Sequence, residues 1–292
     1  MIDTTLTLAD GRSLGMAEWG PPDAPVVVYC HGFPGSRLEP SLAQAVVEQR
    51  SVNARVIAFD RPGYGRSTFV RNRTFIDWPA DMAEAADRLG VGEFSVLGAS
   101  GGCPYALACA SVLGARVTGV GIVAGVGPLD ATGMPESQLI SGPSNLRILR
   151  KLQWRLVARA ARTDRVDTVI DRTVTTMTGV DREAMKRPDV RAWYRTMFTE
   201  AFDQGAAAAS YEAELYRQLW GFDPADITTE TNLWHGAADQ WVPISVARWL
   251  ADRIPNAHLI EWPDHGHVSW AGSDEAADIV AVTAGERAGP VR

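Results

Sequence analysis

The sequence predicts an α/β fold with a mostly parallel sheet. Short, uninterrupted apolar runs, as expected of strands covered on both faces, alternate with helical patterns in residues 1–127 and 229–292. Between these two parts, helical patterns continue without a convincing strand. The chain has 292 residues, of which 46% are hydrophobic, so it can bury a full core in one large domain or two ordinary ones.

The first part begins with a predicted β-hairpin. Thr4–Leu8 and Leu14–Trp19 alternate between polar and apolar residues, and Asp10-Gly11 between them is a strong turn signal. The uninterrupted apolar run Val26–Cys30 then predicts a strand that is buried on both faces.

A loop that reads HGFPGS, His31–Ser36, ends this buried strand. Glycine in such a loop lets a backbone N–H approach a ligand, and the Phe33 N–H is placed to do so, although a plain turn is the alternative. The elements expected next are a helix at 40–50, a buried strand at 55–59 that ends in the structural loop 60–67, and a helix at 76–89.

A sharp turn that reads GASGG, Gly98–Gly102, separates a predicted strand at 94–97 from a predicted helix at 104–113. The glycines allow strained backbone angles and close packing of strand against helix, so Ser100 is held out with its Oγ exposed. The N-terminus of the helix directs its N–H groups to the same point. This geometry suits a nucleophile, and a glycine turn with a capping serine is the alternative. A further strand is expected at 117–123.

The central part of the chain is predicted to be helical. Helices are expected at 145–161, 166–177, 190–202 and 206–220. We therefore expect a core domain of residues 1–127 and 229–292 and a helical cap of residues 128–228. This cap should cover the carboxyl ends of the strands, where ligands bind in open α/β sheets, and should select the substrate.

One helix of this central part is predicted to be amphipathic. Its basic residues recur every three to four positions, and its leucines fall on another face; the basic residues are Arg147, Lys151, Arg155, Arg159 and Arg162. A basic face could recognise an anionic partner or a membrane surface, but a solvated outer face is favoured because the whole chain is acidic.

The alternation of strands and helices resumes near residue 229. Strands are expected at 232–235 and 257–261, with a helix that begins at Pro243 between them and a last helix after residue 267. Asp239 and His267 follow these two strands. They should lie at the same edge of the sheet as Ser100 if the strands are parallel.

Three loops of this sequence resemble those of the α/β hydrolase family in their order and spacing. They are Cys30–Pro34 (CHGFP), Asp60–Ser67 (DRPGYGRS) and Gly98–Gly102 (GASGG). The resemblance covers residues 1 to about 127 and resumes near 229. It implies an eight-stranded, mostly parallel sheet flanked by helices, with a helical cap after the sixth strand, and catalytic residues in the order Ser, Asp, His.

Acyl transfer needs these three residue types together. A serine hydroxyl is a poor nucleophile until a neutral imidazole takes its proton, and a carboxylate fixes the imidazole tautomer. We expect Ser100 to be the nucleophile, His267 the general base and then the general acid, and Asp239 the orienting carboxylate.

The surroundings of these residues are also expected to take part. The N–H groups of Phe33 and Gly101 should form an oxyanion hole. Trp241 and Trp270 flank the expected site residues and suggest an apolar pocket, although such aromatic residues are common in cores as well. The chemistry requires no cofactor and no metal ion.

Some assignments have competitors in the sequence. His265 is two residues from His267, but the family pattern places a glycine directly before the catalytic histidine, as Gly266 is here. Asp130 occupies a position that some members use for the acid, although Asp239 is favoured. A His-x-His metal site at 265 and 267 is poorly supported because no third ligand is evident.

The resemblance limits the chemistry. Epoxide hydrolases and haloalkane dehalogenases of similar outline carry Asp where this chain has Ser100, so an alkyl-enzyme mechanism is not expected. We expect a serine hydrolase that acts by an acyl-enzyme on a small, apolar ester, lactone or thioester. A carbon–carbon bond hydrolase, an acyltransferase, a triad-bearing receptor or regulator with slow turnover, and the family's perhydrolase side activity remain open.

Charge and composition narrow the partners. The formal net charge of -7 argues against a nucleic-acid partner held by phosphate contacts. We expect a small-molecule substrate, no membrane insertion, and no signal peptide in the first residues. The odd number of cysteines, three, favours reduced thiols and a cytoplasmic protein. The oligomeric state cannot be read from the sequence.

Overall fold

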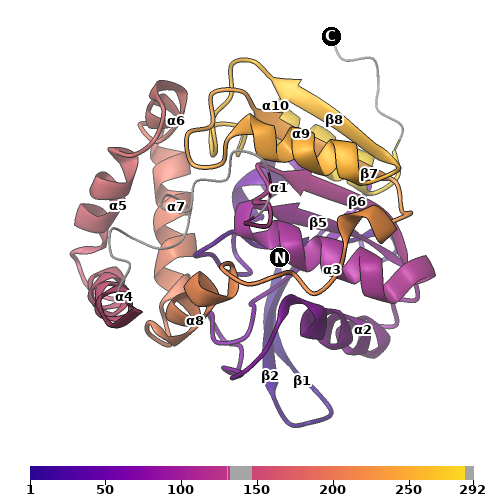
Figure 1. The fold of residues 1–292 in the computed structure, drawn as a ribbon, viewed down its shortest axis with the longest axis horizontal. Helices are drawn as coiled ribbons and strands as arrows, with labels where there is room; N and C mark the ends of the chain where they lie inside the picture. Colours follow the sequence, from indigo (N-terminus) through magenta and orange to yellow (C-terminus); the bar gives the residue numbers. More distant parts are fainter. Residues whose placement is uncertain (130, 132–146, 287–292) are drawn as a thin grey trace.

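An eight-stranded sheet forms the centre of the fold in the computed structural model, which describes residues 1–129, 131 and 147–286 (Figure 1). The strand order is β1-β2-β4-β3-β5-β6-β7-β8. The strands are β1 (Ile2–Thr7), β2 (Ser13–Trp19), β3 (Val26–Cys30), β4 (Arg55–Phe59), β5 (Phe94–Ala99), β6 (Val117–Val123), β7 (Thr231–Gly236) and β8 (Ala257–Trp262).

Most of the sheet is parallel. The hairpin β1–β2 is antiparallel and β2 pairs antiparallel with β4, whereas the other neighbours run parallel. The predicted fold class is therefore confirmed. Because the parallel strands share one direction, the loops that follow β3, β5, β7 and β8 come together at one edge of the sheet.

Five helices cover the two faces of the sheet (Figure 1). Side chains of α2, α3 and α9 pack with one face of the strands in the largest apolar cluster, and those of α1 and α10 pack with the other face. These helices are α1 (Ser41–Gln49), α2 (Trp78–Arg88), α3 (Cys103–Leu113), α9 (Ile244–Arg253) and α10 (Asp274–Thr283). Helix α9 begins one residue later than expected, because Pro243 has extended backbone angles and precedes the helix.

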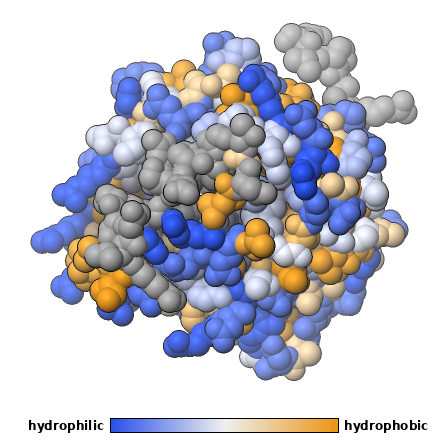
Figure 2. Space-filling model, viewed as in Figure 1, coloured by the Kyte–Doolittle hydropathy of each residue, from blue (hydrophilic) through white to orange (hydrophobic). Residues whose placement is uncertain are grey.

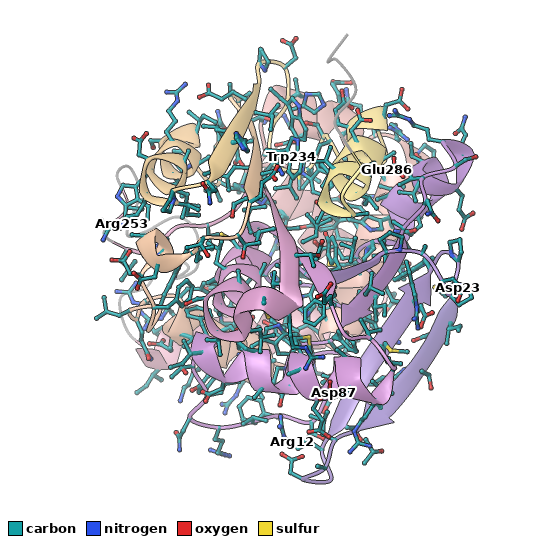
Figure 3. All side chains as sticks on the ribbon, turned by 90° about the vertical axis from the view of Figure 1, so that its right-hand side faces the viewer. Arg12, Asp23, Asp87, Trp234, Arg253 and Glu286 are labelled. Carbon is teal, nitrogen blue, oxygen red and sulfur yellow. The ribbon has the colours of Figure 1, made fainter. Side chains whose placement is uncertain are left out.

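Figure 3 shows how the labelled charged and apolar side chains are placed about the sheet. Arg12, Asp87 and Arg253 lie at the periphery of the molecule, whereas Trp234 of β7 lies inside, where it joins the apolar cluster under α1 and α10. No helix in the described part of the chain is long and apolar enough to span a membrane.

In the described part of the segment between β6 and β7 there are five further α-helices, and we call them the helical insertion. They are α4 (Arg147–Ala161), α5 (Val166–Val174), α6 (Gly179–Ala184), α7 (Pro188–Ala201) and α8 (Ala207–Leu215). Figure 1 shows them gathered to one side of the sheet, and their side chains form an apolar cluster of their own.

Two features of the helical insertion differ from the sequence-based expectation. The sequence did not predict α6, because six residues are too few to show a helical period. The last helix ends at Leu215, five residues before the expected Trp220, and Trp220 instead packs its ring against Phe75 of the core.

The amphipathic prediction for α4 is wrong in its apolar face. The predicted apolar residues Leu149, Leu152 and Leu156 are 47%, 49% and 61% exposed, and the packed side of the helix contains Ala158 and Ala161 instead. Trp154 and Val157 pack on the same side of α4, with the Trp154 ring centre 6.1 Å from that of Phe202, so the leucines face outward. Figure 2 shows apolar residues at the lower left, the side on which α4 lies in Figure 1, on an otherwise mostly hydrophilic face.

Candidate active site

Ser100 occupies the turn between β5 and α3 with a left-handed φ of 49°. Few residues other than glycine adopt such an angle, and it persists only where neighbours enforce it. Gly98 and Gly102 provide the room: a Cβ on Gly98 would lie 2.9 Å from the Gly102 carbonyl oxygen, and a Cβ on Gly102 would collide with the Cys30 carbonyl. The strained turn that the sequence predicts is present.

The side chain of His267 connects Ser100 to Asp239. Its Nε2 lies 2.9 Å from Ser100 Oγ, and its Nδ1 lies 2.7 Å from Asp239 Oδ2. The three residues come from the loops after β5, β7 and β8, which the parallel sheet brings to one edge. The structure thus brings together the three residues that the sequence singled out.

Backbone donors orient the Asp239 carboxylate. Its Oδ1 accepts hydrogen bonds from the N–H groups of Trp241 at 2.8 Å and Val242 at 2.9 Å, which leaves Oδ2 for His267. Burial alone would raise the pKa of Asp239, but the charge of His267 and hydrogen bonds from His235 and His267 hold the pKa below its ordinary value. An ionised carboxylate only accepts hydrogen bonds, so Nδ1 of His267 carries the proton and Nε2 presents its lone pair to Ser100.

Burial of His267 disfavours its charged form, yet its pKa is raised above the ordinary value. The charge of Asp239 and the hydrogen bond to it outweigh the desolvation, and the carboxylates of Asp181 and Glu39 add to the effect. Such an imidazole can accept the proton of a serine hydroxyl and hold the resulting charge beside Asp239.

Phe33 and Gly101 lie next to each other beside Ser100. A Cβ on Gly101 would lie 3.0 Å from the Phe33 nitrogen, and the Gly101 carbonyl accepts a hydrogen bond from the Tyr216 hydroxyl. The Phe33 backbone nitrogen therefore lies beside the residue that follows Ser100. The role of the Phe33 and Gly101 N–H groups in binding an oxyanion stays a prediction.

The sequence offered competitors for the histidine, for the acid and for the kind of site. His265 is directed away from Ser100, with its ring 5.2 Å from that of Trp262 and its Nε2 3.9 Å from Glu275. Asp130 lies outside the described residues. Among the residues that the structure describes, no group of three or more His, Cys, Asp or Glu side chains is placed to hold a metal ion.

The sequence matches the family model described as "alpha/beta hydrolase fold" over residues 25–270, which is most of the chain and includes Ser100, Asp239 and His267. The chain belongs to the α/β hydrolase fold family. It is 28% identical over 271 residues to a bifunctional esterase/perhydrolase of Acinetobacter calcoaceticus, a match that covers 90% of this chain and 92% of that protein. It is 27% identical over 276 residues to a non-heme chloroperoxidase of Burkholderia pyrrocinia, with 90% and 92% covered.

The fold is also similar to solved structures of this α/β hydrolase family. An esterase from Exiguobacterium antarcticum superposes with a TM-score of 0.71 at 18% identity, over 97% of this chain and 99% of that one. At this identity the likeness shows the fold alone.

In this α/β hydrolase, the two tryptophans near the site have different surroundings. The Trp241 ring centre lies 5.0 Å from that of His267, and its indole N–H donates to Thr176 in the helical insertion. Trp270 donates its indole N–H to the His267 carbonyl and lines a small cavity on the other side of the His267 loop. Whether either ring contacts a substrate stays a prediction.

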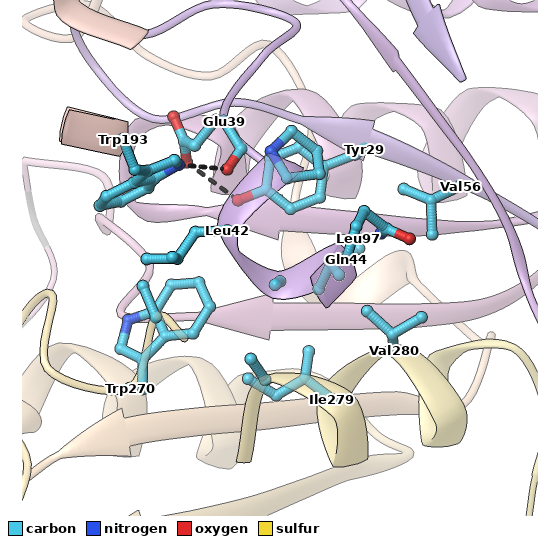
Figure 4. Close-up of a pocket in the computed structure, with 14 residues that line it drawn as sticks. Tyr29, Glu39, Leu42, Gln44, Val56, Leu97, Trp193, Trp270, Ile279 and Val280 are labelled. Atoms are coloured by element: carbon cyan, nitrogen blue, oxygen red, sulfur yellow. Dashed lines mark hydrogen bonds between the residues drawn. The ribbon is translucent and has the colours of Figure 1, made fainter. Parts of the chain in front are cut away.

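Sequence reasoning missed Glu39, which lines that same small cavity (Figure 4). Its carboxylate accepts hydrogen bonds from the Gly32 N–H at 2.8 Å and the Tyr29 hydroxyl at 2.9 Å, and its carbonyl accepts one from Trp193. Burial raises the pKa of Glu39 to about 7. Glu39 thus holds the loop that carries Phe33, and only its place shortly after the HGFPGS loop could have indicated it.

Glu212 of α8 is a second carboxylate that the sequence did not identify. It is fully buried between Arg61 and Arg73, which donate to it at 2.7 to 2.9 Å. Arg61 in turn donates to the carbonyls of His31 and Gly32, the residues before Phe33. Through this ion pair, Glu212 of the helical insertion holds the Arg61 side chain against the loop that precedes Phe33. In the sequence, Glu212 is one of several acidic residues in a helical pattern.

Proposed function

We propose that this chain is a serine hydrolase that cleaves a small ester, lactone or thioester through an acyl-enzyme. The observation that carries the proposal is the continuous hydrogen-bonded path from Ser100 Oγ through the His267 imidazole to the Asp239 carboxylate. Similarity over nine-tenths of the chain to a bifunctional esterase/perhydrolase supports the same chemistry.

In the first half of the reaction, Ser100 Oγ attacks the carbonyl carbon while its proton passes to His267 Nε2. The negative charge that develops on the carbonyl oxygen is held by the N–H groups of Phe33 and Gly101, and each donor contributes about 3 kcal/mol to transition-state stabilisation. When the tetrahedral intermediate collapses, the alcohol or thiol leaves with the proton from His267. The acyl group remains on Ser100.

In the second half, water attacks the acyl-enzyme and gives its proton to His267 Nε2. Collapse of this intermediate releases the acid and returns the proton to Ser100 Oγ. Asp239 keeps its charge throughout, and it stabilises the imidazolium in both halves. The helical insertion, as a cap of residues 128–228 over the core of residues 1–127 and 229–292, would determine which acyl groups enter.

Covalent labelling tests this proposal. A fluorophosphonate probe should label the native chain at Ser100, and Ser100→Ala should abolish the labelling while the thermal unfolding temperature stays within a few degrees. The Ser95→Ala variant is a matched control, because Ser95 lies in β5 of the same turn unit and contacts Thr118 rather than His267. Labelling that persists in Ser100→Ala would refute the assignment.

Perhydrolysis is a second candidate activity, because the relatives named above include a perhydrolase and a non-heme chloroperoxidase. The same acyl-enzyme would be attacked by hydrogen peroxide in place of water, to give a peracid and free Ser100. Peracid formation that requires Ser100 and competes with acid formation would support it. Acid as the sole product at high peroxide concentration would contradict it.

The rate of turnover and the identity of the product distinguish a hydrolase from a receptor, a regulator or an acyltransferase. A receptor or regulator would release its acyl product slowly, and an acyltransferase would release an acylated acceptor in preference to the acid. Multiple turnovers of a p-nitrophenyl ester within seconds, with free acid as product, would support the hydrolase.

A further inference from the structure

Asp181 of α6 reaches out of the helical insertion to the loop that carries His267. Its Oδ2 accepts a hydrogen bond from the His267 N–H at 2.8 Å, and its Oδ1 accepts from the N–H groups of Val268 at 3.0 Å and Ser269 at 2.9 Å. The residue is only 1% exposed. One buried carboxylate therefore binds three consecutive backbone donors of this loop.

The carboxylate is itself held in place. Thr178, the N-cap of α6, donates its hydroxyl to Asp181 Oδ2 at 3.0 Å and accepts from the Asp181 N–H at 3.2 Å. On the other side lies Gly266, where the three atoms nearest to an added Cβ all belong to the Asp181 carboxylate. Glycine before His267 is thus needed because the carboxylate fills the space that a side chain would occupy.

Few other contacts hold the backbone of His267 in place. The loop after β8 runs from residue 263 to residue 273 without a helix or strand, so no regular hydrogen-bond ladder fixes it. Yet the imidazole must reach Ser100 Oγ at 2.9 Å and Asp239 at 2.7 Å at the same time. Charge-assisted hydrogen bonds to a buried carboxylate are strong enough to hold a backbone in such a place.

We propose that Asp181 is a positioning residue: it fixes the backbone of residues 267–269 so that His267 meets Ser100 and Asp239, and it couples the helical insertion to the reacting groups. This inference rests on the proposed function, in which His267 transfers the proton. It goes beyond that function because it places part of the proton-transfer machinery in α6, outside the sheet and its loops.

The charge of Asp181 should affect the pKa of His267, which a role in packing alone would not do. Among the described residues, three carboxylates raise the pKa of His267 and so favour the imidazolium: Asp239 from the loop after β7, Glu39 from the loop after β3, and Asp181 from α6. Removal of one negative charge therefore lowers the pKa of His267. Loss of the hydrogen bonds also displaces the imidazole, and a displacement near 1 Å costs on the order of 100-fold in rate.

The Asp181→Asn variant tests both consequences. An amide has one acceptor oxygen, so either the His267 N–H or the Val268 and Ser269 N–H groups face an NH₂ group. We expect kcat to fall by about 10- to 100-fold with KM changed by less than about 3-fold. The His267 pKa, followed by ¹⁵N NMR of the imidazole and assigned with His267→Gln, should fall below that of the native chain. Asp189→Asn is the matched control, because Asp189 lies in the first turn of α7 but is exposed and paired with Arg187.

A double-mutant cycle provides a second measurement, which also serves if Asp181→Asn does not fold. Gly266→Ala keeps the carboxylate but pushes it away, so kcat should fall. In the Asp181→Ala background the added methyl has room, so Gly266→Ala should cause no further loss. Equal losses from Gly266→Ala in both backgrounds, or an Asp181→Asn variant with the kcat and His267 pKa of Asp189→Asn, would overturn the proposal.

Failure of the proposed function would look different. If Ser100 is not the nucleophile, the native chain is not labelled at Ser100, whereas the NMR pKa of His267 still responds to Asp181→Asn. If the inference fails, the native chain is labelled and the pKa does not respond.

Discussion

The Glu212 carboxylate of the helical insertion forms a two-pronged ion pair with Arg61 of the core, at 2.9 and 2.8 Å, and both side chains are fully buried. Burial alone would raise the pKa of Glu212, but the charges of Arg61 and Arg73 hold it below its ordinary value. The pair also fixes the loop before Phe33, because Arg61 donates to the carbonyls of His31 and Gly32. The Glu212–Arg61 ion pair therefore contributes both to the stability of the fold and to the geometry of the candidate site.

Substitution Glu212→Ala should leave the buried guanidinium groups of Arg61 and Arg73 without the carboxylate that they share. We expect a loss of about 3–5 kcal/mol in the free energy of unfolding, measured by urea denaturation at pH 7. Glu183→Ala is the control, since that residue is 70% exposed in its pair with Lys186 and should change stability by less than about 0.5 kcal/mol. A Glu212→Ala variant within about 1 kcal/mol of the native chain would show that the buried pair is dispensable.

The pH dependence of activity should follow His267. Only the neutral imidazole accepts the Ser100 proton, so kcat/KM should rise as pH increases through the pKa of His267. Because the charge of Asp239 raises that pKa despite burial, the midpoint should lie above the ordinary value of about 6.5. In Asp239→Asn, kcat should fall by about 10⁴-fold and the midpoint should move down. A midpoint below 6 in the native chain would contradict this electrostatic picture.

Glu39 should make stability depend on pH in the opposite sense to an ordinary ion-paired carboxylate. Burial raises its pKa to about 7, above the unfolded value, so its contribution is fully present at low pH and is lost as pH rises through about 7. Glu39→Gln removes this loss. The variant should gain stability relative to the native chain between about pH 4.5 and 7, by at most roughly 3 kcal/mol, and the difference should stay constant above that range.

Unfolding measurements at pH 4, 7 and 9 would check the Glu39 prediction. Glu84→Gln serves as the control, because Glu84 is only partly buried and its i, i+4 partner Arg88 is exposed. If the difference between Glu39→Gln and the native chain is the same at pH 4 and pH 9, Glu39 has the same pKa in the folded and the unfolded chain, and its burial does not penalise the charge.

The parts of the fold that the sequence predicts best are those fixed by local signals. A short, mostly apolar run such as Val117–Val123 favours a strand, and its bounds agree with those of β6. The Gly98–Gly102 turn is also local, because only small residues tolerate the contacts of Gly102 with the Cys30 carbonyl. Ser100, Asp239 and His267 could be nominated because the family order and a parallel sheet together bring them to one edge, although their catalytic role stays a prediction.

What the sequence could not reveal depends on partners that are distant along the chain. Asp181 is 86 positions from His267, and Glu212 is 151 positions from Arg61. In the sequence, Asp181 lies between two expected helices and Glu212 lies within one, and nothing distinguishes either from the other acidic residues until the helical insertion packs against the core. The apolar face of α4 was misassigned for a similar reason, since its neighbours and not its own periodicity decide which side is buried.

Close packing at the Ser100 turn predicts that Gly102 and Gly92 respond differently to substitution. A Cβ on Gly102 would collide with the carbonyls of Cys30 and His31, which are backbone atoms and cannot rotate away, whereas nothing lies within 4 Å of a Cβ on Gly92. Gly92 also lacks a left-handed φ. Gly102→Ala should therefore lower the free energy of unfolding by about 1–3 kcal/mol, and Gly92→Ala should change it by less than about 0.5 kcal/mol.

The Gly102→Ala and Gly92→Ala variants should also differ in activity. To relieve the collision, the end of β3 must move away from α3, which carries Phe33 away from Gly101 and separates the two N–H donors beside Ser100. Loss of one such donor costs about 100-fold or more in kcat, so Gly102→Ala should lose most of its activity under conditions where it remains folded, and Gly92→Ala should keep its activity. Equal kcat values for the two folded variants would show that the site tolerates this movement, and the proposed oxyanion hole at Phe33 and Gly101 would then be wrong.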